Sequence, residues 1–468
     1  MQLKSIFTNS FGILLSRVTG LGRDVLMASA LGASIWSDMF FVAFKLPNLF
    51  RRIFAEGAFT QAFMPSFIAS KYKGVFATAI FLRFLLFLMA FSLLITFFPE
   101  PITKLLALGW DAEQIANTSP LTAINFWYLD LIFIVTFLAT LLQYKEHFAT
   151  TAMSTMLLNI SMIVALWLFM KEDPKTVAYA LSFAVLIGGA LQVLVHVITL
   201  YRLRLHTLLI GGWKYRKVKD IEEEKKHFSS LFIPGILGNS TPQISAFIDT
   251  ILATFLMTGS VSYLFYANRV FQLPLAIIAI ATATVLFPAV SKALKNGQEE
   301  KAYANLHKAF WLLAFLLGAS MLGGLLMAEP IVWLLFERGK FTLIQTQETV
   351  YVLQMYMLGL LPFGLAKLFS MFLYASHRHL KAAKIAVYSL ITSVSFSLIL
   401  MQFMGVAGLA LAGSIGGWVL FIFTVKEVGV GKFINIVKTK NSFIFLAIMP
   451  LFAGILYFIN AWILTLIR

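Results

Sequence analysis

Long apolar runs recur along the whole chain, and they constrain the fold more than any other feature. A helix needs about 20 apolar residues to cross the ~30 Å hydrocarbon core of a bilayer. The composition agrees, since 60% of the 468 residues are hydrophobic and only 12% are charged. In lipid every backbone polar group needs an internal partner, so repeated apolar runs favour helices. The sequence therefore predicts an all-α polytopic membrane protein.

Polar breaks divide the chain into thirteen predicted spans. They are residues 5–32, 37–70, 75–98, 120–143, 150–170, 176–200, 228–257, 261–291, 304–328, 346–375, 383–402, 405–425 and 443–466. Basic residues are retained on the cytoplasmic side of such proteins. A cytoplasmic N-terminus leaves 21 Lys and Arg in the inner connections and 5 in the outer ones, and we expect that orientation. This asymmetry also accounts for most of the +16 net charge, so we expect no nucleic-acid partner.

The longest polar interval separates six predicted helices from seven. We expect an N-terminal lobe at 1–205, a cytoplasmic linker at 206–227 lying on the membrane surface, a second lobe at 228–427 and an extra C-terminal segment at 428–468. An offset of 227 residues suggests that the lobes are parallel repeats, although chance in a Phe- and Leu-rich chain is an alternative. It aligns Gly32 with Gly259, Phe44 with Phe271, Leu46 with Leu273 and Pro47 with Pro274.

Eight basic residues fall inside predicted spans, where a charge costs at least ~2.5–3.5 kcal/mol unless it meets a cavity or a partner. They are Arg17, Arg23, Lys45, Arg51, Arg52, Arg83, Arg269 and Lys367. Five of them lie within 17–52, where the acidic neighbours in the same two helices are only Asp24, Asp38 and Glu56. Salt bridging or snorkelling is the alternative explanation, but three acids cannot neutralise five bases. Arginine offers a planar fork that matches phosphate oxygens, so the excess predicts a phosphate-bearing substrate.

Two of the predicted spans that contain basic residues, 37–70 and 261–291, also contain a proline close to those residues. Pro47 lacks an N–H and its ring clashes with the carbonyl of Ala43, so we expect a hinge there and a related one at Pro274. Just before Pro274, Arg269 and Gln272 share one helix face. Arg83 lies near a span end and is expected to snorkel.

Several classes of chemistry are excluded. The chain has no cysteine, its seven histidines are scattered, and we expect no metal site. The fragment at 429–433 lacks the upstream glycine and the hydroxyl of a phosphate-binding loop. No catalytic constellation is evident, so we expect a protein that is not an enzyme and has no cofactor, with transport coupled to the membrane potential or to a monovalent ion.

The segments that contain these charges are similar to segments of a known protein family. The run DMFFVAFKLPNLFRRIFAEGAFTQAFMP at 38–65 and the block SRVTGLGRD at 16–24 closely resemble the MurJ (MviN) family of lipid II flippases, in the MOP superfamily. SYLFYANRVFQLPL at 262–275, TVLFPAVSKAL at 284–294 and LFERGKFT at 335–342 agree. The similarity covers roughly residues 1–375. It implies two six-helix lobes around a central cationic cavity, with C-terminal helices that form a groove for the polyprenyl tail.

The resemblance also assigns roles to individual positions. Arg17, Arg23, Arg51 and Arg269 match the family's important arginines, and we add Arg52 as a further substrate-binding candidate. Asp24, Asp38, Asn48, Glu56 and Ser262 match positions that the family uses, which we expect to serve gating or support, and Ala28 matches a small residue lining the cavity. Many members have acids at the positions of Asn268 and Gln272, which are neutral here, so a gating salt bridge from those positions is in doubt. The family commonly has two helices after the twelfth, so fourteen spans are the alternative to thirteen.

The expected function is movement of lipid II, the undecaprenyl-pyrophosphate-linked peptidoglycan precursor, from the cytoplasmic to the periplasmic leaflet by alternating access. We therefore expect the chain to lie in the bacterial inner membrane, in contact with membrane lipids and with cell-wall synthesis proteins as candidate partners. Its expected contribution is to cell wall biogenesis and cell shape. The alternatives are a related oligosaccharide-lipid exporter, a MATE-type cation-coupled drug antiporter, or a scaffold for cell-wall enzymes. The arginine excess argues against the antiporter, whose cationic substrates favour carboxylates, and a scaffold would not explain it.

Overall fold

The computed structural model describes residues 2–51, 59–217 and 220–467, and in these residues all regular structure is helical. Contacts divide the chain into two compact units, Met1–Phe247 and Ile248–Arg468. Unit 1 contains the helices α1 (Gln2–Leu31), α2 (Ile35–Phe50), α3 (Phe59–Ala69), α4 (Lys73–Phe97), α5 (Pro99–Leu106), α6 (Ala112–Phe126), α7 (Tyr128–Tyr144), α8 (Ala149–Phe169), α9 (Pro174–Arg202), α10 (His206–Tyr215) and most of α11 (Glu222–Ala253).

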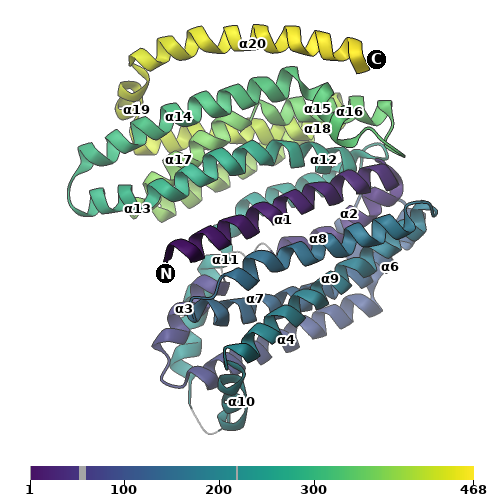
Figure 1. Cartoon of the computed structure of the whole chain (residues 1–468), viewed down its shortest axis with the longest axis vertical. Helices are drawn as coiled ribbons and strands as arrows, with labels where there is room; N and C mark the ends of the chain where they lie inside the picture. Colours follow the sequence, from purple (N-terminus) through teal and green to yellow (C-terminus); the bar gives the residue numbers. More distant parts are fainter. Residues whose placement is uncertain (1, 52–58, 218–219, 468) are drawn as a thin grey trace. The chain divides into compact units, whose positions relative to one another are not determined.

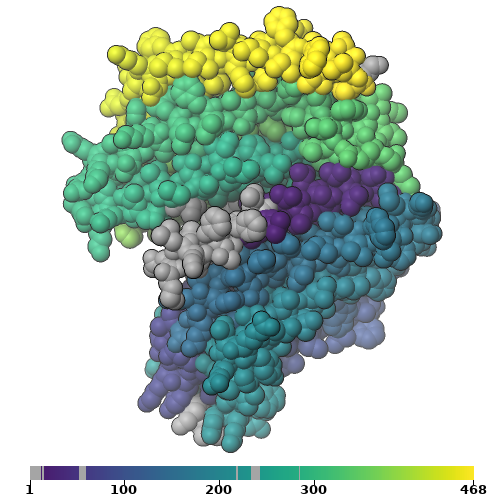
Figure 2. Space-filling view, in the orientation of Figure 1, coloured from purple at the N-terminus to yellow at the C-terminus, as the bar shows by residue number. Residues whose placement is uncertain are grey.

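Unit 2 begins at the end of α11 and runs to the C-terminus (Figure 1). Its elements are α12 (Ser260–Pro274), the π-helix η2 (Leu275–Ile280), α13 (Ala281–Lys295), α14 (Glu299–Leu326), α15 (Ala328–Phe336), α16 (Leu343–Met357), α17 (Leu360–Ala375), α18 (His379–Val428), α19 (Val430–Val437) and α20 (Lys440–Ile467). In the space-filling view α20 forms a continuous band along the edge of this unit (Figure 2).

Nine helical stretches in the described residues are long and apolar enough to cross a membrane. They cover ten of the thirteen expected spans, because α18 holds two of them on either side of Gly405, where φ is 55°. The other three expected spans contain α1, α2 with α3, and α11. Helix α2 has only 16 residues, and α1 carries three charges near its centre, so neither is a plain apolar span. The all-α polytopic fold predicted from the sequence is confirmed.

Local sequence signals set several helix ends. Ser34 and Ser37 form a capping box at the start of α2, and Asp111 and Gln114 form another at the start of α6. Asp173 caps α9, and the Thr176 hydroxyl and nearby backbone N–H groups lower the pKa of its carboxylate. These caps satisfy N–H groups that a helix terminus leaves without an intrahelical partner.

A cluster of phenylalanines forms the core of unit 1. The Phe59 ring packs against Phe63 at 5.3 Å between centroids and against Phe228 at 5.9 Å. Phe84 packs against Phe232 at 5.2 Å. The first half of α11 is therefore packed in unit 1, which extends to Phe247. The expected division into lobes rests on polarity alone and stays a prediction.

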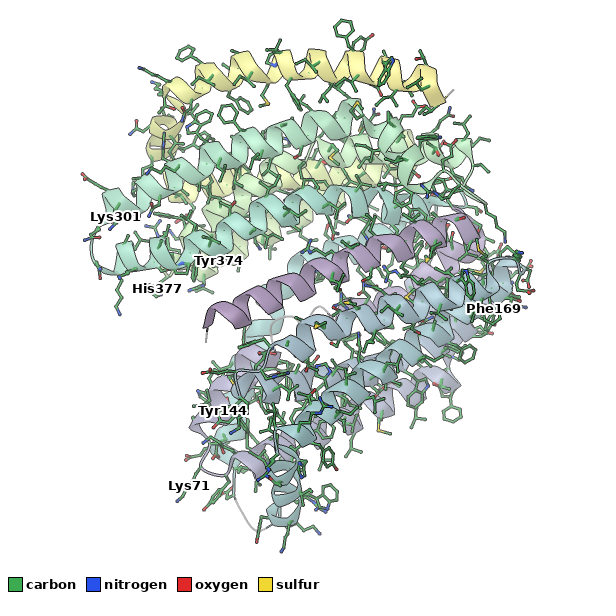
Figure 3. All side chains as sticks on the ribbon, in the orientation of Figure 1. Lys71, Tyr144, Phe169, Lys301, Tyr374 and His377 are labelled. Carbon is green, nitrogen blue, oxygen red and sulfur yellow. The ribbon has the colours of Figure 1, made fainter. Side chains whose placement is uncertain are left out.

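Residues with matching expected topology gather at the same end of each unit. In unit 1, Lys71 and Tyr144 lie at one end and Phe169 at the other; in unit 2, Lys301, Tyr374 and His377 lie at one end (Figure 3). Between the ends, large apolar side chains on α4 such as Leu86 and Phe87 are more than half exposed. An exposed apolar band of this kind is expected of a surface that meets lipid.

Candidate functional site

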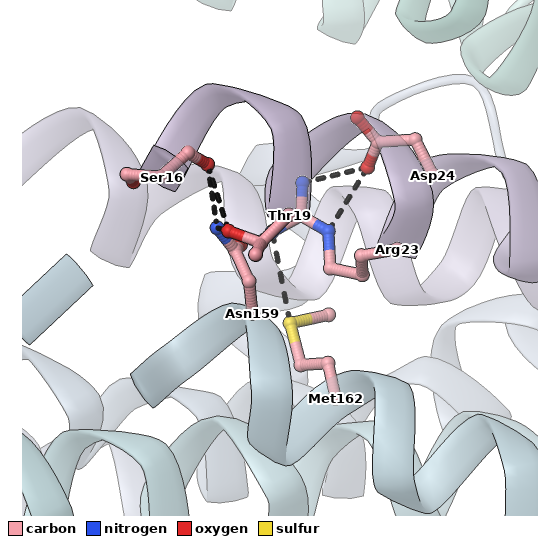
Figure 4. A network of polar contacts seen from close by, with 6 residues as sticks. All are labelled: Ser16, Thr19, Arg23, Asp24, Asn159 and Met162. Carbon is pink, nitrogen blue, oxygen red and sulfur yellow. Dashed lines mark hydrogen bonds and ion pairs between the residues drawn. The ribbon is translucent and has the colours of Figure 1, made fainter. Parts of the chain in front are cut away.

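A buried ion pair lies in the middle of α1. The guanidinium of Arg23 donates two hydrogen bonds to Asp24 Oδ1, from Nε at 2.9 Å and from Nη2 at 2.6 Å (Figure 4). Asp24 is fully buried and Arg23 is 8% exposed. A buried charge needs a partner and hydrogen bonds to offset its desolvation, and Asp24 supplies both to its neighbour. Part of the charge at Arg23 is thus balanced within the helix.

Arg23 also reaches a second helix of unit 1. Its Nη1 donates to Asn159 Oδ1 on α8 at 3.1 Å and contacts the sulfur of Met162 at 3.8 Å. The Asn159 amide in turn donates to the Ser16 carbonyl at 3.0 Å and to the Thr19 hydroxyl at 3.2 Å (Figure 4). One amide group therefore fixes the guanidinium and ties α1 to α8.

Sequence reasoning missed Asn159. The sequence signal that could have found it is an amide inside an apolar run, one helical turn after Thr155. In the structure the Thr155 hydroxyl donates to Ser16 Oγ at 2.8 Å. Two acids were also missed. Asp130 on α7 is buried and accepts a 2.5 Å hydrogen bond from the Ser92 hydroxyl, and Asp249 accepts one from the Ser397 hydroxyl at 3.2 Å in unit 2.

The other expected basic residues of unit 1 differ in exposure. Arg17 is exposed, whereas Arg51 is half-buried and donates from Nε to Asn48 Oδ1 at 3.2 Å. The Asn48 amide therefore orients Arg51 much as Asn159 orients Arg23. Arg52 and Glu56 lie outside the described residues, so their expected roles stay predictions.

Three further candidate positions are buried: Asp38 is 2% exposed, and Ala28 and Ser262 are fully buried. Pro47 lies inside α2, which continues to Phe50. Pro274 ends α12, and the chain continues directly as the π-helix η2. π-Helical turns are frequent at functional sites and kinks. A hinge role for either proline stays a prediction.

In unit 2, Arg269 is near two neutral residues in the sequence, Asn268 and Gln272. The Gln272 amide donates to Asn268 Oδ1, so the two neutral residues hydrogen-bond each other. The guanidinium carbon of Arg269 lies 5.6 Å from the centre of the Phe265 ring, within the range of a cation–π contact. Arg269 is half-buried. An arginine oriented by an aromatic ring can still direct its fork at a phosphate or carboxylate.

Arg83, which is expected to snorkel, and Lys367 are both exposed. The rings of His377 and His379 lie 6.3 Å apart. Among the described residues no group of three or more His, Asp or Glu side chains is placed to hold a metal ion.

A polytopic helical bundle with Arg23 buried and with Arg51 and Arg269 half-buried inside its helices has the features of a membrane transporter. Its fold is shared with a multidrug resistance MATE family transporter of the MOP superfamily in an inward-facing conformation, with a TM-score of 0.67, 14% identity and coverage of 93% of this chain and 99% of that one. It also matches a structure of lipid II flippase MurJ in an inward closed conformation, with a TM-score of 0.79, 26% identity and coverage of 98% and 99%.

The family of this chain is established by sequence. The family described as lipid II flippase MurJ matches residues 27–466. A probable lipid II flippase MurJ of Helicobacter pylori strain 26695 is 48% identical over 430 residues, which are 90% of this chain and 93% of the relative. A probable lipid II flippase MurJ of Buchnera aphidicola from Acyrthosiphon pisum is 31% identical over 96% of this chain and 88% of the relative. The chain belongs to the MurJ family.

Proposed function

We propose that this chain is a lipid II flippase, which carries the undecaprenyl-pyrophosphate-linked peptidoglycan precursor between the leaflets of the bacterial inner membrane. The observation that carries the proposal is the 48% identity to a probable lipid II flippase across nine-tenths of the chain. The arginines oriented inside its helices supply the chemistry that a pyrophosphate needs.

The proposed cycle is alternating access from the cytoplasmic to the periplasmic side, with the N-terminus in the cytoplasm. The basic connections support this orientation through the retention of Lys and Arg on the inner side. In the cycle, Arg17, Arg23, Arg51, Arg52 and Arg269 bind the headgroup, and Asp24, Asp38 and Glu56 balance their charge when no substrate is bound.

In the proposed cycle, binding and release alternate at Arg23 by exchange of its anionic partner. Asp24 and Asn159 hold the guanidinium in place, and Asp24 offsets its charge. A pyrophosphate oxygen competes with Asp24 for the same N–H groups, so the arginine exchanges one anionic partner for another. Exchange costs less than exposing a bare charge in a low-dielectric site. Membrane potential or a monovalent ion drives the cycle in one direction, since each elementary charge moved through 100 mV is worth ~2.3 kcal/mol.

A cation-coupled drug antiporter is supported less well, although the fold is shared with transporters of that class. Such a carrier needs carboxylates that are available to cationic substrates. In the described part of unit 1, the carboxylate of Asp24 is engaged by Arg23 at 2.6 Å. The identity to those transporters is 14%, which shows a common fold alone.

Depletion of the chain in its native cell tests the proposal. We expect lipid II that is accessible to an external probe to fall while the inner pool rises. Re-expression of the native chain or of Arg83→Ala should restore the surface pool. An unchanged surface pool after full depletion would contradict the proposal.

A further inference from the structure

A largely open cavity in unit 1 is lined by none of the described arginines of α1 and α2. It has a volume of about 430 Å³ and is formed where α10 packs against the beginning of α4. Its walls include Val75 and Leu208 as apolar groups and Tyr72, Lys73 and Tyr215 as polar ones. The size is within the range of pockets that take a small molecule or a headgroup.

The α4–α10 contact that forms the cavity is close and specific. A Cβ atom at Gly212 would overlap the carbonyl group of Gly74, and one at Gly74 would lie 2.5 Å from the carbonyl oxygen of Leu208. The Thr78 hydroxyl donates to the carbonyl of Leu209 at 3.3 Å. Helix α10 is therefore docked backbone to backbone on α4, and the cavity is a fixed part of unit 1.

One lysine lines the cavity and two more lie next to its tyrosines. Lys73 is one of its walls, and two of its tyrosines each have a further lysine beside the ring. Lys71 Nζ lies 5.8 Å from the Tyr72 ring centre, and Lys214 Nζ lies 5.7 Å from that of Tyr215. No acidic side chain is among the described lining residues. Acidic residues begin in α11, where Glu224 accepts a hydrogen bond from the Ser70 hydroxyl. The charge of the cavity is suited to an anion.

The outer surface of α10 carries both exposed apolar and basic side chains. Ile210 is 62% exposed and Trp213 is 51% exposed, and the Arg216 guanidinium lies 3.6 Å from the Trp213 ring centre. Exposed apolar residues with adjacent basic ones are typical of a helix that lies in the membrane interface. Basic clusters on such helices bind anionic lipids.

We propose that the cavity between α4 and α10 binds the headgroup of an anionic phospholipid from the surrounding leaflet. The apolar walls contact the glycerol and upper acyl carbons, and Lys73, Lys71 and Lys214 attract the phosphate, with the tyrosine hydroxyls as donors. The proposal depends on the membrane location of the chain and not on its transport of lipid II. Because α10 is docked through a glycine pair, a bound lipid would fasten this end of unit 1 to the bilayer.

Photocrosslinking from one position tests the proposal. The chain has no cysteine, so Thr207→Cys at the cavity wall can carry the only benzophenone maleimide. The full chain is placed in phosphatidylcholine nanodiscs that contain a minority of phosphatidylglycerol, and adducts are identified by mass. Phe87→Cys, on the lipid-exposed side of α4, samples the bulk lipid.

We expect the phosphatidylglycerol share of adducts at position 207 to exceed its mole fraction several-fold and to match it at position 87. Adding Lys73→Gln and Lys214→Gln should bring position 207 down to the bulk ratio, whereas the matched control Lys301→Gln should leave it enriched. Adducts in the bulk ratio with the native lysines, or enrichment that survives both substitutions, would overturn the proposal. Preferential adducts with added lipid II would overturn it as well, without affecting the proposed transport function.

Discussion

Asn159 Oδ1 accepts a 3.1 Å hydrogen bond from Arg23 Nη1, and the two residues are 136 positions apart in the sequence. The same side-chain amide donates to α1 one and two turns before Arg23, at Thr19 and Ser16 respectively. Asn159 is therefore a positioning residue for the guanidinium. Its neutrality matters, because it orients Arg23 without cancelling its charge.

We expect Asn159→Ala and Asn159→Asp to impair the chain for different reasons. Alanine leaves Arg23 without an oriented acceptor, and a hydrogen bond to a charged group contributes roughly 1.5–3 kcal/mol. Aspartate keeps an acceptor for Arg23 but loses the amide donor to Ser16 and Thr19, and it adds a second negative charge beside Arg23. Lipid II binding should therefore fall even in the fraction of this variant that remains folded. Thermal stability and lipid II binding of the purified variants separate the two effects. Equal binding by Asn159→Asp and the native chain would show that the charge of Arg23 is not used.

The buried pair of Arg23 and Asp24 predicts strong coupling between the two positions. Asp24→Asn alone leaves a buried guanidinium less well compensated, and breaking such a pair costs roughly 3–5 kcal/mol. In the background of Arg23→Ala the same substitution should cost much less. A double-mutant cycle on thermal stability measures the difference. Additive losses would mean that the pair does not form in the membrane.

The equilibrium between the conformations of the transporter gives a second test of the acidic residues, besides stability. Asp24→Asn, Asp38→Asn and Glu56→Gln should change crosslinking between engineered cysteine pairs in the two units more than they change lipid II affinity, because their expected role is to balance the basic residues. If Glu56→Gln left crosslinking unchanged yet strongly weakened binding, the supporting role would be wrong and Glu56 would contact substrate.

The close contact between Gly74 and Gly212 predicts that alanine substitutions at the adjacent glycines 211 and 212 of α10 have different effects. A Cβ at Gly212 would overlap Gly74, whereas one at the adjacent Gly211 would have no atom within 4 Å. Gly212→Ala should therefore loosen α10, with a cost of about 1–3 kcal/mol as for other overpacked sites. Limited proteolysis after α10 measures the effect, and Gly211→Ala is the matched control. Equal protection in both variants would contradict the close docking.

Topology can be tested with single cysteines, since the native chain has none. We expect position 217 to be cytoplasmic and position 173 to face outward. A membrane-impermeant thiol reagent should label Asp173→Cys in intact cells and leave Lys217→Cys unlabelled until the cells are opened. The reverse pattern would invert the orientation.

The fold could be predicted from the sequence because its main signal, the apolar run, is local. Span ends were predicted from polar breaks, and the turn at Gly405 coincides with the first residue of the expected span 405–425. The unit boundary could not be predicted in the same way. Phe228 and Phe232 look like any apolar residues of a span, and only their packing on Phe59 and Phe84 shows that this half of α11 belongs to unit 1.

The candidate site was predictable in part for a related reason. A charge in an apolar run is conspicuous, so Arg23, Arg51 and Arg269 stood out from the sequence. The neutral partner Asn48 was named only through the family resemblance, and Asn159 was missed, because an amide in a membrane helix is common enough to pass as a packing residue. The sequence does not show which charged residue an amide far along the chain contacts. The packing of α8 on α1 shows that Asn159 contacts Arg23.

The central claim is that arginines of both units bind the pyrophosphate of lipid II, and binding by purified variants tests it most directly. Native mass spectrometry of the full chain with lipid II should show at least roughly tenfold weaker binding for Arg23→Ala and for Arg269→Ala, since losing a charged hydrogen bond of ~1.5–3 kcal/mol changes affinity by about that factor or more. Arg269→Lys keeps the charge without the fork and should lose less, and the exposed Arg83→Ala should bind as the native chain does. Native-like binding by Arg269→Ala, in a variant that remains folded, would contradict the claim.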